Sequence, residues 1–199
     1  MDKRIVREAL WKHEGEELEI NITKRYGCYV SILKALKGQM DAMQSHYSRV
    51  HVIRLDLHMN DYSGDNEKIS RMMGKLTEWI KKKYSTSRVG YIWVREHEKA
   101  KSQHYHLAIM IDGRAIQYPA KVIEWVESYW QLRDEPKPFT PRNCYALMER
   151  DKPQTYQKAF YRISYLAKER GKGYKNPTAN NYSVSRIKSK KEHLALLEN

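Results

Sequence analysis

Residues 88–113 read RVGYIWVREHEKAKSQHYHLAIMIDG, two apolar segments separated by a short charged one. In the second segment Tyr105, Leu107 and Ile109 alternate with the polar His104 and His106, and a period of two is typical of strands. The polar residues 98–102 supply a turn, and Asp112-Gly113 closes the second strand. The pattern therefore predicts an antiparallel hairpin with strands at 88–97 and 103–111.

The segments on either side of this hairpin extend the pattern to an α+β fold. VHVIRLDLH (50–58) alternates in the same way, and NCYALM (143–148) follows a Pro-rich loop as a predicted edge strand. Helical spacing of apolar residues recurs in four segments: 28–47, from Asp65 to Tyr84, from Pro119 onward, and from Pro153 to Gly171. We therefore expect a βαββαβ core, an antiparallel sheet with helices on one face and the other face open, as in ferredoxin-like or RNA-recognition-motif-like (RRM-like) folds.

Composition is consistent with a globular protein in a reducing compartment. The 199 residues include two cysteines, Cys28 and Cys144, and contain no apolar run long enough to span a bilayer. We expect three parts: a charged N-terminal lead and helix (1–49), a folded domain (50–170) and a basic C-terminal tail (171–199). A cytoplasmic protein without membrane contact is expected.

Positive charge is concentrated near the C-terminus. The formal net charge is +13, and residues 150–191 hold 12 basic and two acidic residues, which is +10 of that excess. Clustered charge of this kind favours a polyanion such as nucleic acid as partner. A solvated face or a solubilising tail is the alternative that charge alone leaves open.

Polar side chains of three predicted strands fall on a common face. His104 and His106 point to the same side, and Glu96 lies opposite His104 if the turn is centred near Ala100. Two imidazoles and one carboxylate suit a catalytic divalent ion with open positions. Asp56 and His58, together with Arg54, form the polar side of strand 50–58. Asp56 and His58 are candidates for additional or outer ligands, although ordinary strand polarity is the better explanation for each.

The last predicted helix carries a second group of chemically active side chains. At 100° per residue, Tyr161, Tyr165 and Lys168 project within ~60° of one another, opposite the apolar stripe. A tyrosine hydroxyl can attack phosphorus when a neighbouring cation favours its ionised form. Surface tyrosines on a basic helix are the alternative interpretation.

These motifs resemble those of a known superfamily. His104-Tyr105-His106 in a strand, followed in the last helix by Tyr165-x-x-Lys168, is similar to the signature of HUH endonucleases, which include rolling-circle replication initiators and relaxases. Glu96 precedes His104 at a spacing similar to that of the third metal ligand in viral initiators. The chain is most similar in outline to the replication initiation proteins of filamentous phages (inoviruses) and to YagK/YfjJ-type proteins of integrated elements, over about residues 50 to 170.

The resemblance implies an enzyme that nicks and rejoins single-stranded DNA at an origin. It implies Mg²⁺ or Mn²⁺ bound by Glu96, His104 and His106, attack by Tyr165 to give a 5′-phosphotyrosine, and Lys168 beside the nucleophile. Tyr161 and Tyr165 also resemble the two-tyrosine members, so either one or both tyrosines react. The sequence has no GxxxxGK[ST] motif, so a host helicase and a host polymerase of a bacterial cell are expected partners. The basic residues expected to contact DNA are Arg54, Arg162, Lys172 and Lys175.

Two other functions remain open at this point. A transposase of the HUH kind would cut the ends of an element instead of an origin. A regulator without catalysis would use the same basic sheet and its aromatic side chains to bind nucleic acid. Formation of a metal-dependent covalent adduct with DNA separates both enzymes from the regulator.

Overall fold

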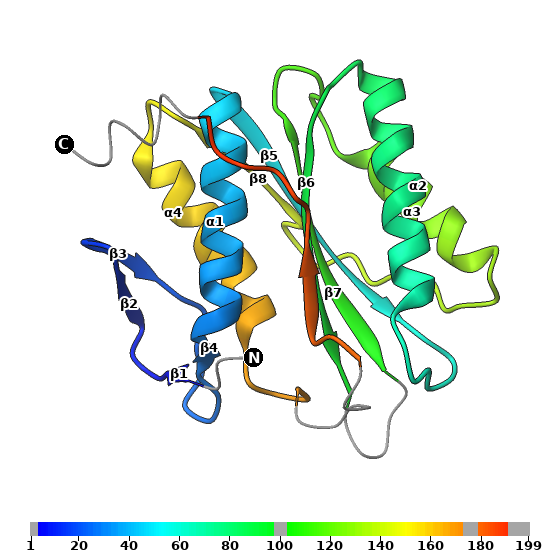
Figure 1. Ribbon diagram of the computed structural model, residues 1–199, viewed down its shortest axis with the longest axis horizontal. Helices are drawn as coiled ribbons and strands as arrows, with labels where there is room; N and C mark the ends of the chain where they lie inside the picture. Colours follow the sequence, from blue (N-terminus) through cyan, green and yellow to red (C-terminus); the bar gives the residue numbers. More distant parts are fainter. Residues whose placement is uncertain (1–3, 98–102, 173–178, 191–199) are drawn as a thin grey trace.

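A computed structural model describes residues 4–97, 103–172 and 179–190 of the chain (Figure 1). Its centre is a five-stranded sheet in the order β8-β5-β7-β6-β9, with antiparallel pairing throughout. The strands are β5 (Arg49–His58), β6 (Val89–Glu96), β7 (His104–Asp112), β8 (Tyr145–Glu149) and β9 (Tyr182–Val184). The α+β class and the antiparallel sheet expected from the sequence are therefore confirmed.

The predicted hairpin sets the register of the sheet. β6 pairs with β7 so that Glu96 lies opposite His104, as the sequence predicts. On its other side β7 pairs with β5, which places Asp56 opposite His106. β8 pairs with the remaining edge of β5 and ends the sheet on that side. The turn predicted at 98–102 lies outside the described residues.

Four α-helices accompany the sheet, and their starts follow local signals in the sequence. They are α1 (Val30–His46), α2 (Glu67–Tyr84), α3 (Ala120–Gln131) and α4 (Pro153–Ile163). The N-cap of α2 is Asn66 and not Asp65 as predicted, but Asp65 still supports the start of the helix, because its Oδ1 accepts the backbone N–H of Glu67 at 2.8 Å. Pro153 occupies the first turn of α4, where its missing N–H costs nothing. Within the described ranges, no helix has the length and apolar character needed to cross a bilayer.

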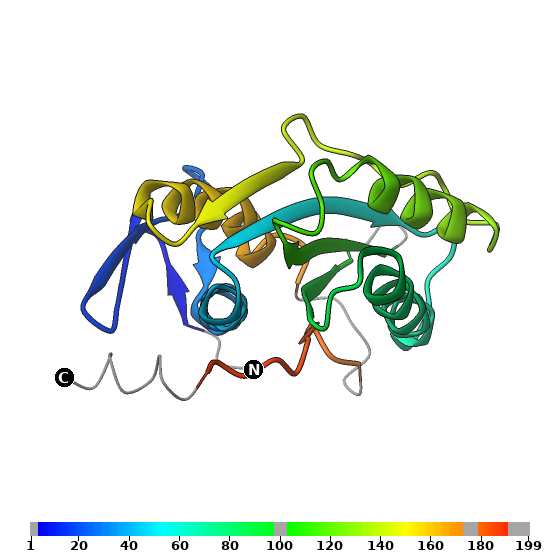
Figure 2. The same ribbon diagram turned by 90° about the horizontal axis from the view of Figure 1, so that it is seen from above.

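Helices cover both faces of the sheet (Figure 2). The expectation that one face would be open is therefore wrong. α2 and α3 pack on the face that carries Ile53, Leu55 and Leu107. α1 and α4 pack on the opposite face, over Val52 and Met110. On this second face, the side chains of β5 are apolar where the helices cover the strand and polar where the strand extends beyond the helices. The second face is therefore open only at the end that carries the histidines.

The close approach of α1 to the sheet depends on one glycine. A Cβ at Gly90 would lie 2.7 Å from Cγ of Met43 and 3.1 Å from Cβ of Met110. Real Cβ atoms do not approach so closely without movement of their neighbours. The glycine in β6 therefore lets α1 lie directly against the centre of the sheet.

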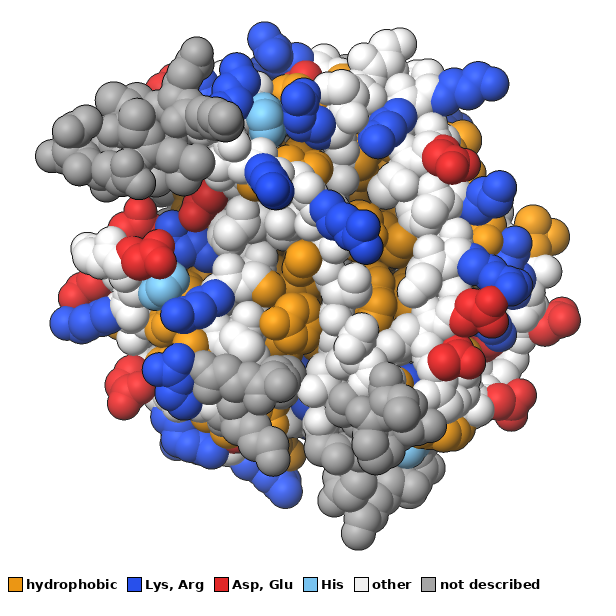
Figure 3. Space-filling view, in the orientation of Figure 1, with side chains coloured by type: hydrophobic (Ala, Val, Ile, Leu, Met, Phe, Trp, Pro, Cys, Tyr) orange, Lys and Arg blue, Asp and Glu red, His pale blue; other side chains and the backbone are white. Residues whose placement is uncertain are grey.

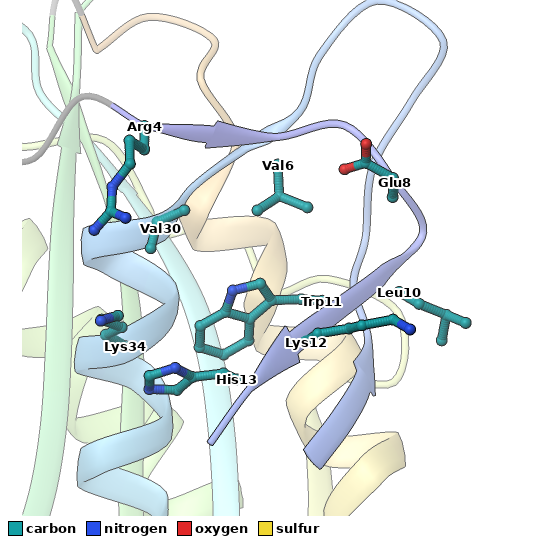
Figure 4. Close-up of a pocket in the computed structure, with 9 residues that line it drawn as sticks. All are labelled: Arg4, Val6, Glu8, Leu10, Trp11, Lys12, His13, Val30 and Lys34. Carbon is teal, nitrogen blue, oxygen red and sulfur yellow. The ribbon is translucent and has the colours of Figure 1, made fainter. Parts of the chain in front are cut away.

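The N-terminal residues, expected to be a charged lead without pattern, form ordered structure. They contain β1 (Ile5–Val6), β2 (Leu10–His13), β3 (Glu16–Glu19) and β4 (Cys28–Tyr29), paired as β1-β4 and β2-β3. Trp11 is buried beside α1, where its ring stacks on Phe160 with 5.9 Å between centroids (Figure 4). Val184 also packs against the core beneath α1. This core therefore includes residues from all three predicted parts of the chain, 1–49, 50–170 and 171–199.

The last helix is shorter than its predicted span of Pro153 to Gly171. α4 ends at Ile163, and a 3₁₀ turn, η1 (Ser164–Ala167), follows it. The Ser164 hydroxyl donates to Tyr161 O at 2.7 Å and accepts the backbone N–H of Asn21 at 2.8 Å. Such a side chain bond offers the backbone an alternative to helical bonding. Tyr165 therefore lies on the turn, and Tyr161 lies on the helix.

The basic tail is partly built into the sheet, contrary to expectation. β9 pairs with β6, and the backbone N–H of Arg95 donates to Asn181 O at 2.8 Å. In Figure 3, Lys and Arg side chains gather in the upper part of the face, above a centre that is mainly hydrophobic and uncharged, and acidic side chains lie toward the margins. One end of the basic segment thus completes the sheet.

Trp130→Ala is expected to destabilise the fold by about 3–5 kcal/mol, the range for deletion of a fully buried tryptophan. Trp130 is 0% exposed, and its Nε1 donates to His58 O at 2.7 Å. The control Trp125→Ala lies in the same helix but is only partly buried, against Trp79. Urea denaturation measures both losses. Equal losses would contradict the placement of Trp130 in the core.

Candidate metal centre

Three potential metal ligands meet at the turn end of the β6-β7 hairpin. Glu96, His104 and His106 each offer a ligand atom within 4.8 Å of the others. Glu96 Oε2 lies 3.1 Å from Nε2 of His104 and 3.1 Å from Nε2 of His106. The strand register brings these atoms together, because side chains opposite one another on neighbouring strands share a face. The structure therefore assembles the ligand group that the sequence predicts.

The donors fit a divalent ion with open coordination positions. His106 is 3% exposed, and its Nε2 is buried without a hydrogen-bond partner among the described residues, although it faces Glu96. A buried polar atom without a partner is costly, and a bound cation would satisfy it. Two imidazoles and one carboxylate are ligand types that divalent metal ions bind in proteins. The buried Glu/His/His group could therefore hold a metal ion.

Asp56 fixes the orientation of His106. Its Oδ1 lies 2.7 Å from Nδ1 of His106, so the bond leaves Nε2 directed at Glu96. Arg54 holds the other side of the carboxylate, with 3.0 Å between Nη2 and Oδ2. A carboxylate behind an imidazole is the usual outer partner of a metal-binding histidine. Asp56 therefore has the position of an outer partner, one of the two roles that the sequence left open. His58 stacks on His104, with 5.3 Å between ring centroids.

The charges within the group hold one another in their ionised forms. Burial would lower the pKa of His106, but the hydrogen bond to Asp56 and the negative charge of the nearby Glu96 raise it above its usual value. Burial would raise the pKa of Glu96, but the hydrogen bond from His104 and the positive charges of Lys172 and His106 hold it well below its usual value. A metal ion would take the place of the proton on His106, because only the neutral imidazole can bind it.

Lys172 belongs to this group and does not lie on the DNA-facing surface expected from its charge. Its side chain is 0% exposed, and its ammonium forms an ion pair with Glu96 and donates to Lys168 O. Glu96 Oε1 is thus held by Lys172, and Oε2 is left to face the histidines. Burial lowers the pKa of Lys172, and the attraction of Glu96 opposes that effect.

The ring of Tyr165 lies directly against the ligand group. It meets the His106 ring edge-on, with 5.2 Å between centroids. The Arg54 guanidinium is 3.8 Å from the centroid of the Tyr165 ring, and Lys168 Nζ is 4.4 Å from it. The half-buried phenol of Tyr165 therefore has two cations over its ring. The sequence predicted the cation of Lys168 beside this tyrosine, but not that of Arg54.

The N-terminal strands hold the segment that carries Tyr165 and Lys168. Cys28 of β4 forms an isolated antiparallel bridge with Lys168, and the backbone N–H of Glu169 donates to Gly27 O at 3.0 Å. The Glu169 carboxylate is held at 2.8 Å by Arg7. These contacts fix the C-terminal end of the turn that presents Tyr165, and no local signal in the sequence predicts them.

Comparison with known families agrees with this arrangement. The family model described as the YagK/YfjJ C-terminal domain matches residues 12–183, from β2 to β9. The chain belongs to this family. No curated protein and no solved structure matches the chain. The matched region of this YagK/YfjJ-family protein contains both the ligand group and Tyr165, together with the N-terminal hairpin that the sequence did not predict.

The remaining predicted site residues lie farther from the ligand group or outside the described chain. Tyr161 is 44% exposed and lines a surface hollow next to Arg54. Arg162 donates to the backbone carbonyl of Asn143. Lys175 lies outside the described residues. Arg54 and Arg162 therefore stay candidates for DNA contact, whereas Lys172 is engaged with Glu96.

Lys172→Met is expected to lower stability by about 3 kcal/mol, because it leaves the Glu96 charge buried without its cation. That loss corresponds to a fall in the melting temperature of roughly 6–12 °C. Added Mn²⁺ is expected to restore more stability to the variant than it adds to the parent, since the ion replaces the lost charge. Thermal unfolding with and without Mn²⁺ measures both effects.

The matched control for this experiment is Lys188→Met, which removes an exposed lysine. It should leave the melting temperature and the response to Mn²⁺ unchanged. An equal response to Mn²⁺ in Lys172→Met and in the control would argue against a cation site at Glu96.

Proposed function

We propose that the protein is a metal-dependent endonuclease and strand transferase of the HUH type, which nicks single-stranded DNA with Tyr165 as nucleophile. The observation that carries the proposal is the contact between the Tyr165 ring and His106, with 5.2 Å between centroids. The Tyr165 side chain thus lies next to two imidazoles and a carboxylate that could hold a cation, which supports its proposed role as nucleophile. Attack on a phosphate needs these two elements in one site.

The topology supports the same proposal. From residue 49 the main sheet follows the order strand, helix, strand, strand, helix, strand, and β8-β5-β7-β6 is the strand order expected of a ferredoxin-like sheet. The two crossover helices, α2 and α3, share one face. The ligand group occupies the opposite face, where the polar ends of β5, β6 and β7 are free of α1. This arrangement is the one that the resemblance to HUH enzymes implies.

The proposed reaction is a transesterification at phosphorus. When bound, the divalent ion supplies positive charge at the scissile phosphate. The Tyr165 hydroxyl loses its proton and attacks phosphorus, a bond from Oη to phosphorus forms, and the bond from phosphorus to the 3′-oxygen breaks. The leaving 3′-oxygen takes up a proton and becomes a hydroxyl, and the 5′-phosphate stays on Tyr165. Attack of a 3′-hydroxyl on the phosphotyrosine reverses these steps and rejoins a strand.

The cations around Tyr165 support the charge changes of this reaction. Arg54 and Lys168 lie over the phenol ring, where their positive charges can offset the negative charge of a phosphate brought to Tyr165. Burial and the neighbouring Arg54 charge lower the pKa of Lys168, while the charge of Glu96 opposes that effect. Lys168 can therefore lose a proton more easily than an exposed lysine. We assign it the role of positioning the phenol and neutralising charge at the phosphate.

In the cell, the proposed role is to start rolling-circle replication of a phage or a mobile element. The free 3′-hydroxyl left by the nick would prime synthesis by a host polymerase. A host helicase would separate the strands. The basic side chains in the upper part of the face shown in Figure 3 suit contact with a DNA backbone.

The experiment that tests the proposal uses single-stranded oligonucleotides tiling the DNA around the gene. Each is labelled at its 3′ end and incubated with the protein and Mn²⁺. A labelled band that migrates with the protein on a denaturing gel, and that EDTA prevents, is the expected result. A 5′-labelled copy should yield a shorter fragment that a polymerase extends. Cleavage products without any protein-linked label would refute a tyrosine nucleophile.

A further inference from the structure

A basic hollow opens next to Tyr165, on the far side of Arg54. It has a volume of about 360 Å³ and lies between α4, the end of β3 and the loop before β8. Its charged and aromatic lining consists of Arg54, Arg142, Lys158, Arg162, Tyr161 and Glu19. This volume is at the lower end of the range for small-molecule sites, ~300–1,000 Å³.

The basic side chains that line the hollow outnumber the carboxylates that could neutralise them. The side chains of Arg142 and Lys158 form no ion pair or hydrogen bond with other residues of the described ranges. Arg162 is bonded only to a neutral backbone carbonyl, that of Asn143, and keeps its charge. Glu19 is the single carboxylate in the lining, so the net charge of the hollow is positive. An anionic group such as a phosphate is the complementary ligand.

Tyr161 gives the hollow an aromatic surface. Its side chain is 44% exposed, although the preceding Phe160 is fully buried in the core. An exposed aromatic ring beside unpaired cations is the combination that binds single-stranded nucleic acid, because the base stacks on the ring and the cations follow the backbone. The three amide side chains in the lining, Asn21, Asn143 and Gln157, can donate to or accept from a base edge.

Arg54 connects the hollow with the nucleophile. It lines the hollow, and its guanidinium also lies 3.8 Å from the centroid of the Tyr165 ring. We propose that the hollow binds the nucleotide next to the scissile phosphate of single-stranded DNA, with its base on Tyr161 and its phosphate among Arg142, Lys158 and Arg162. The inference rests on the proposed function and deepens it. It assigns Tyr161 to substrate binding and not to a second nucleophilic step.

The first test measures binding in the Tyr165→Phe background, so that no cleavage intervenes. Fluorescence anisotropy with a labelled single-stranded 8-mer reports the affinity. Adding Tyr161→Ala should weaken binding by roughly 5- to 150-fold, the loss typical of one stacked base. Adding Tyr161→Phe keeps the ring and should restore most of the affinity. Equal affinity of the alanine and phenylalanine variants would overturn the stacking role.

The second test addresses the phosphate contacts. Replacing Arg142 and Lys158 together with Gln should lower the slope of log K against log salt by about 1.4, since each phosphate contact with single-stranded DNA contributes ~0.7. The matched control replaces Lys75 and Lys82, exposed on α2 at the other face of the sheet. An unchanged slope in the hollow variant, or an equal change in the control, would contradict the phosphate site.

Other ligands give different outcomes in the same assay. Free thymidine monophosphate should compete with the 8-mer only at much higher concentration; competition at equal concentration would assign the hollow to free nucleotides and overturn the proposal. Displacement of the 8-mer by polyglutamate at matched charge would assign it to acidic peptides and also overturn it. Because binding is measured without cleavage, a negative result here and a missing adduct in the nicking assay are separate failures.

Discussion

Tyr165→Phe is expected to abolish the covalent protein–DNA adduct completely. The substitution removes one oxygen, the atom that forms the bond to phosphorus, and keeps the ring that packs against His106 and beneath Arg54. The fold should therefore be unchanged, and the thermal unfolding curve should match that of the parent. The measurement is the 3′-labelled adduct on a denaturing gel, followed by peptide mapping of the adduct formed by the parent.

Tyrosines elsewhere in the chain provide the comparison. Tyr161→Phe should still form the adduct, because Tyr161 lines the neighbouring hollow, and Tyr118→Phe alters a tyrosine that is 64% exposed on the surface. Tyr156 is a poor nucleophile, since burial and the Asp41 carboxylate raise its pKa well above the usual value. Its hydroxyl donates to Asp41 at 2.6 Å. Recovery of the DNA on Tyr161 or Tyr156 would refute the assignment of Tyr165.

His104→Ala and His106→Ala are each expected to eliminate nicking and to weaken Mn²⁺ binding. Loss of an outer partner typically costs ~10–100-fold in metal affinity, and loss of a ligand should cost more. Each variant would keep only two of the three ligands, and two ligands bind the ion more weakly than three. Isothermal titration with Mn²⁺ measures the affinity, and the labelled oligonucleotide measures nicking.

The control is His46→Ala, which alters a histidine on α1 that is bonded to Lys188 O and lies outside the ligand group. Its Mn²⁺ affinity should equal that of the parent. His106→Ala also leaves Asp56 without its histidine partner, so stability is measured alongside binding. Glu96→Gln provides a variant of nearly the same shape, and it should lose Mn²⁺ binding as well. Nicking at the parent's rate by both histidine variants would show that the metal centre is wrong.

Local patterns were sufficient to predict the ligand group and the strands β5, β6, β7 and β8 of the sheet, but not β9. The alternation in QHYHLAIMI fixes which side chains share a face, and the short polar turn fixes the register, so Glu96 falls opposite His104. The geometry of a hairpin depends on residues close in sequence, which is why the sequence shows it. The start of α2 just after Asp65 and of α4 at Pro153 was predictable for the same reason.

Long-range contacts explain what the sequence did not show. The α-helix predicted through Tyr165 ends at Ile163, where the Ser164 hydroxyl bonds the backbone of Asn21 from the N-terminal segment. The short strands of that segment carry too few alternating residues to be recognised, yet Trp11 and Cys28 pack into the core beneath α1. Neither the end of the helix nor the support of the Tyr165 turn has a local signal.

Charge patterning leads to the expectation of a polyanionic partner, but it does not show the place of each cation. Lys172 follows other basic residues and so resembled a phosphate contact, but its side chain is buried and paired with Glu96. Arg54 belongs to the polar side of β5, as expected, and the structure adds its position over Tyr165. A lysine on the surface and a lysine in a buried ion pair have the same local sequence context, because burial depends on which distant segment covers them.

The sequence by itself determined the α+β class, the hairpin register and the identity of the Glu96, His104 and His106 group, since all three follow from periodicity within a strand and its neighbour. Only the tertiary structure decided that helices cover both faces of the sheet, that Tyr165 rather than Tyr161 meets His106, and that Lys172 holds Glu96. These features depend on side chains brought together from distant parts of the chain. The close packing of these distant side chains determines the three features, and no local sequence pattern predicts that packing.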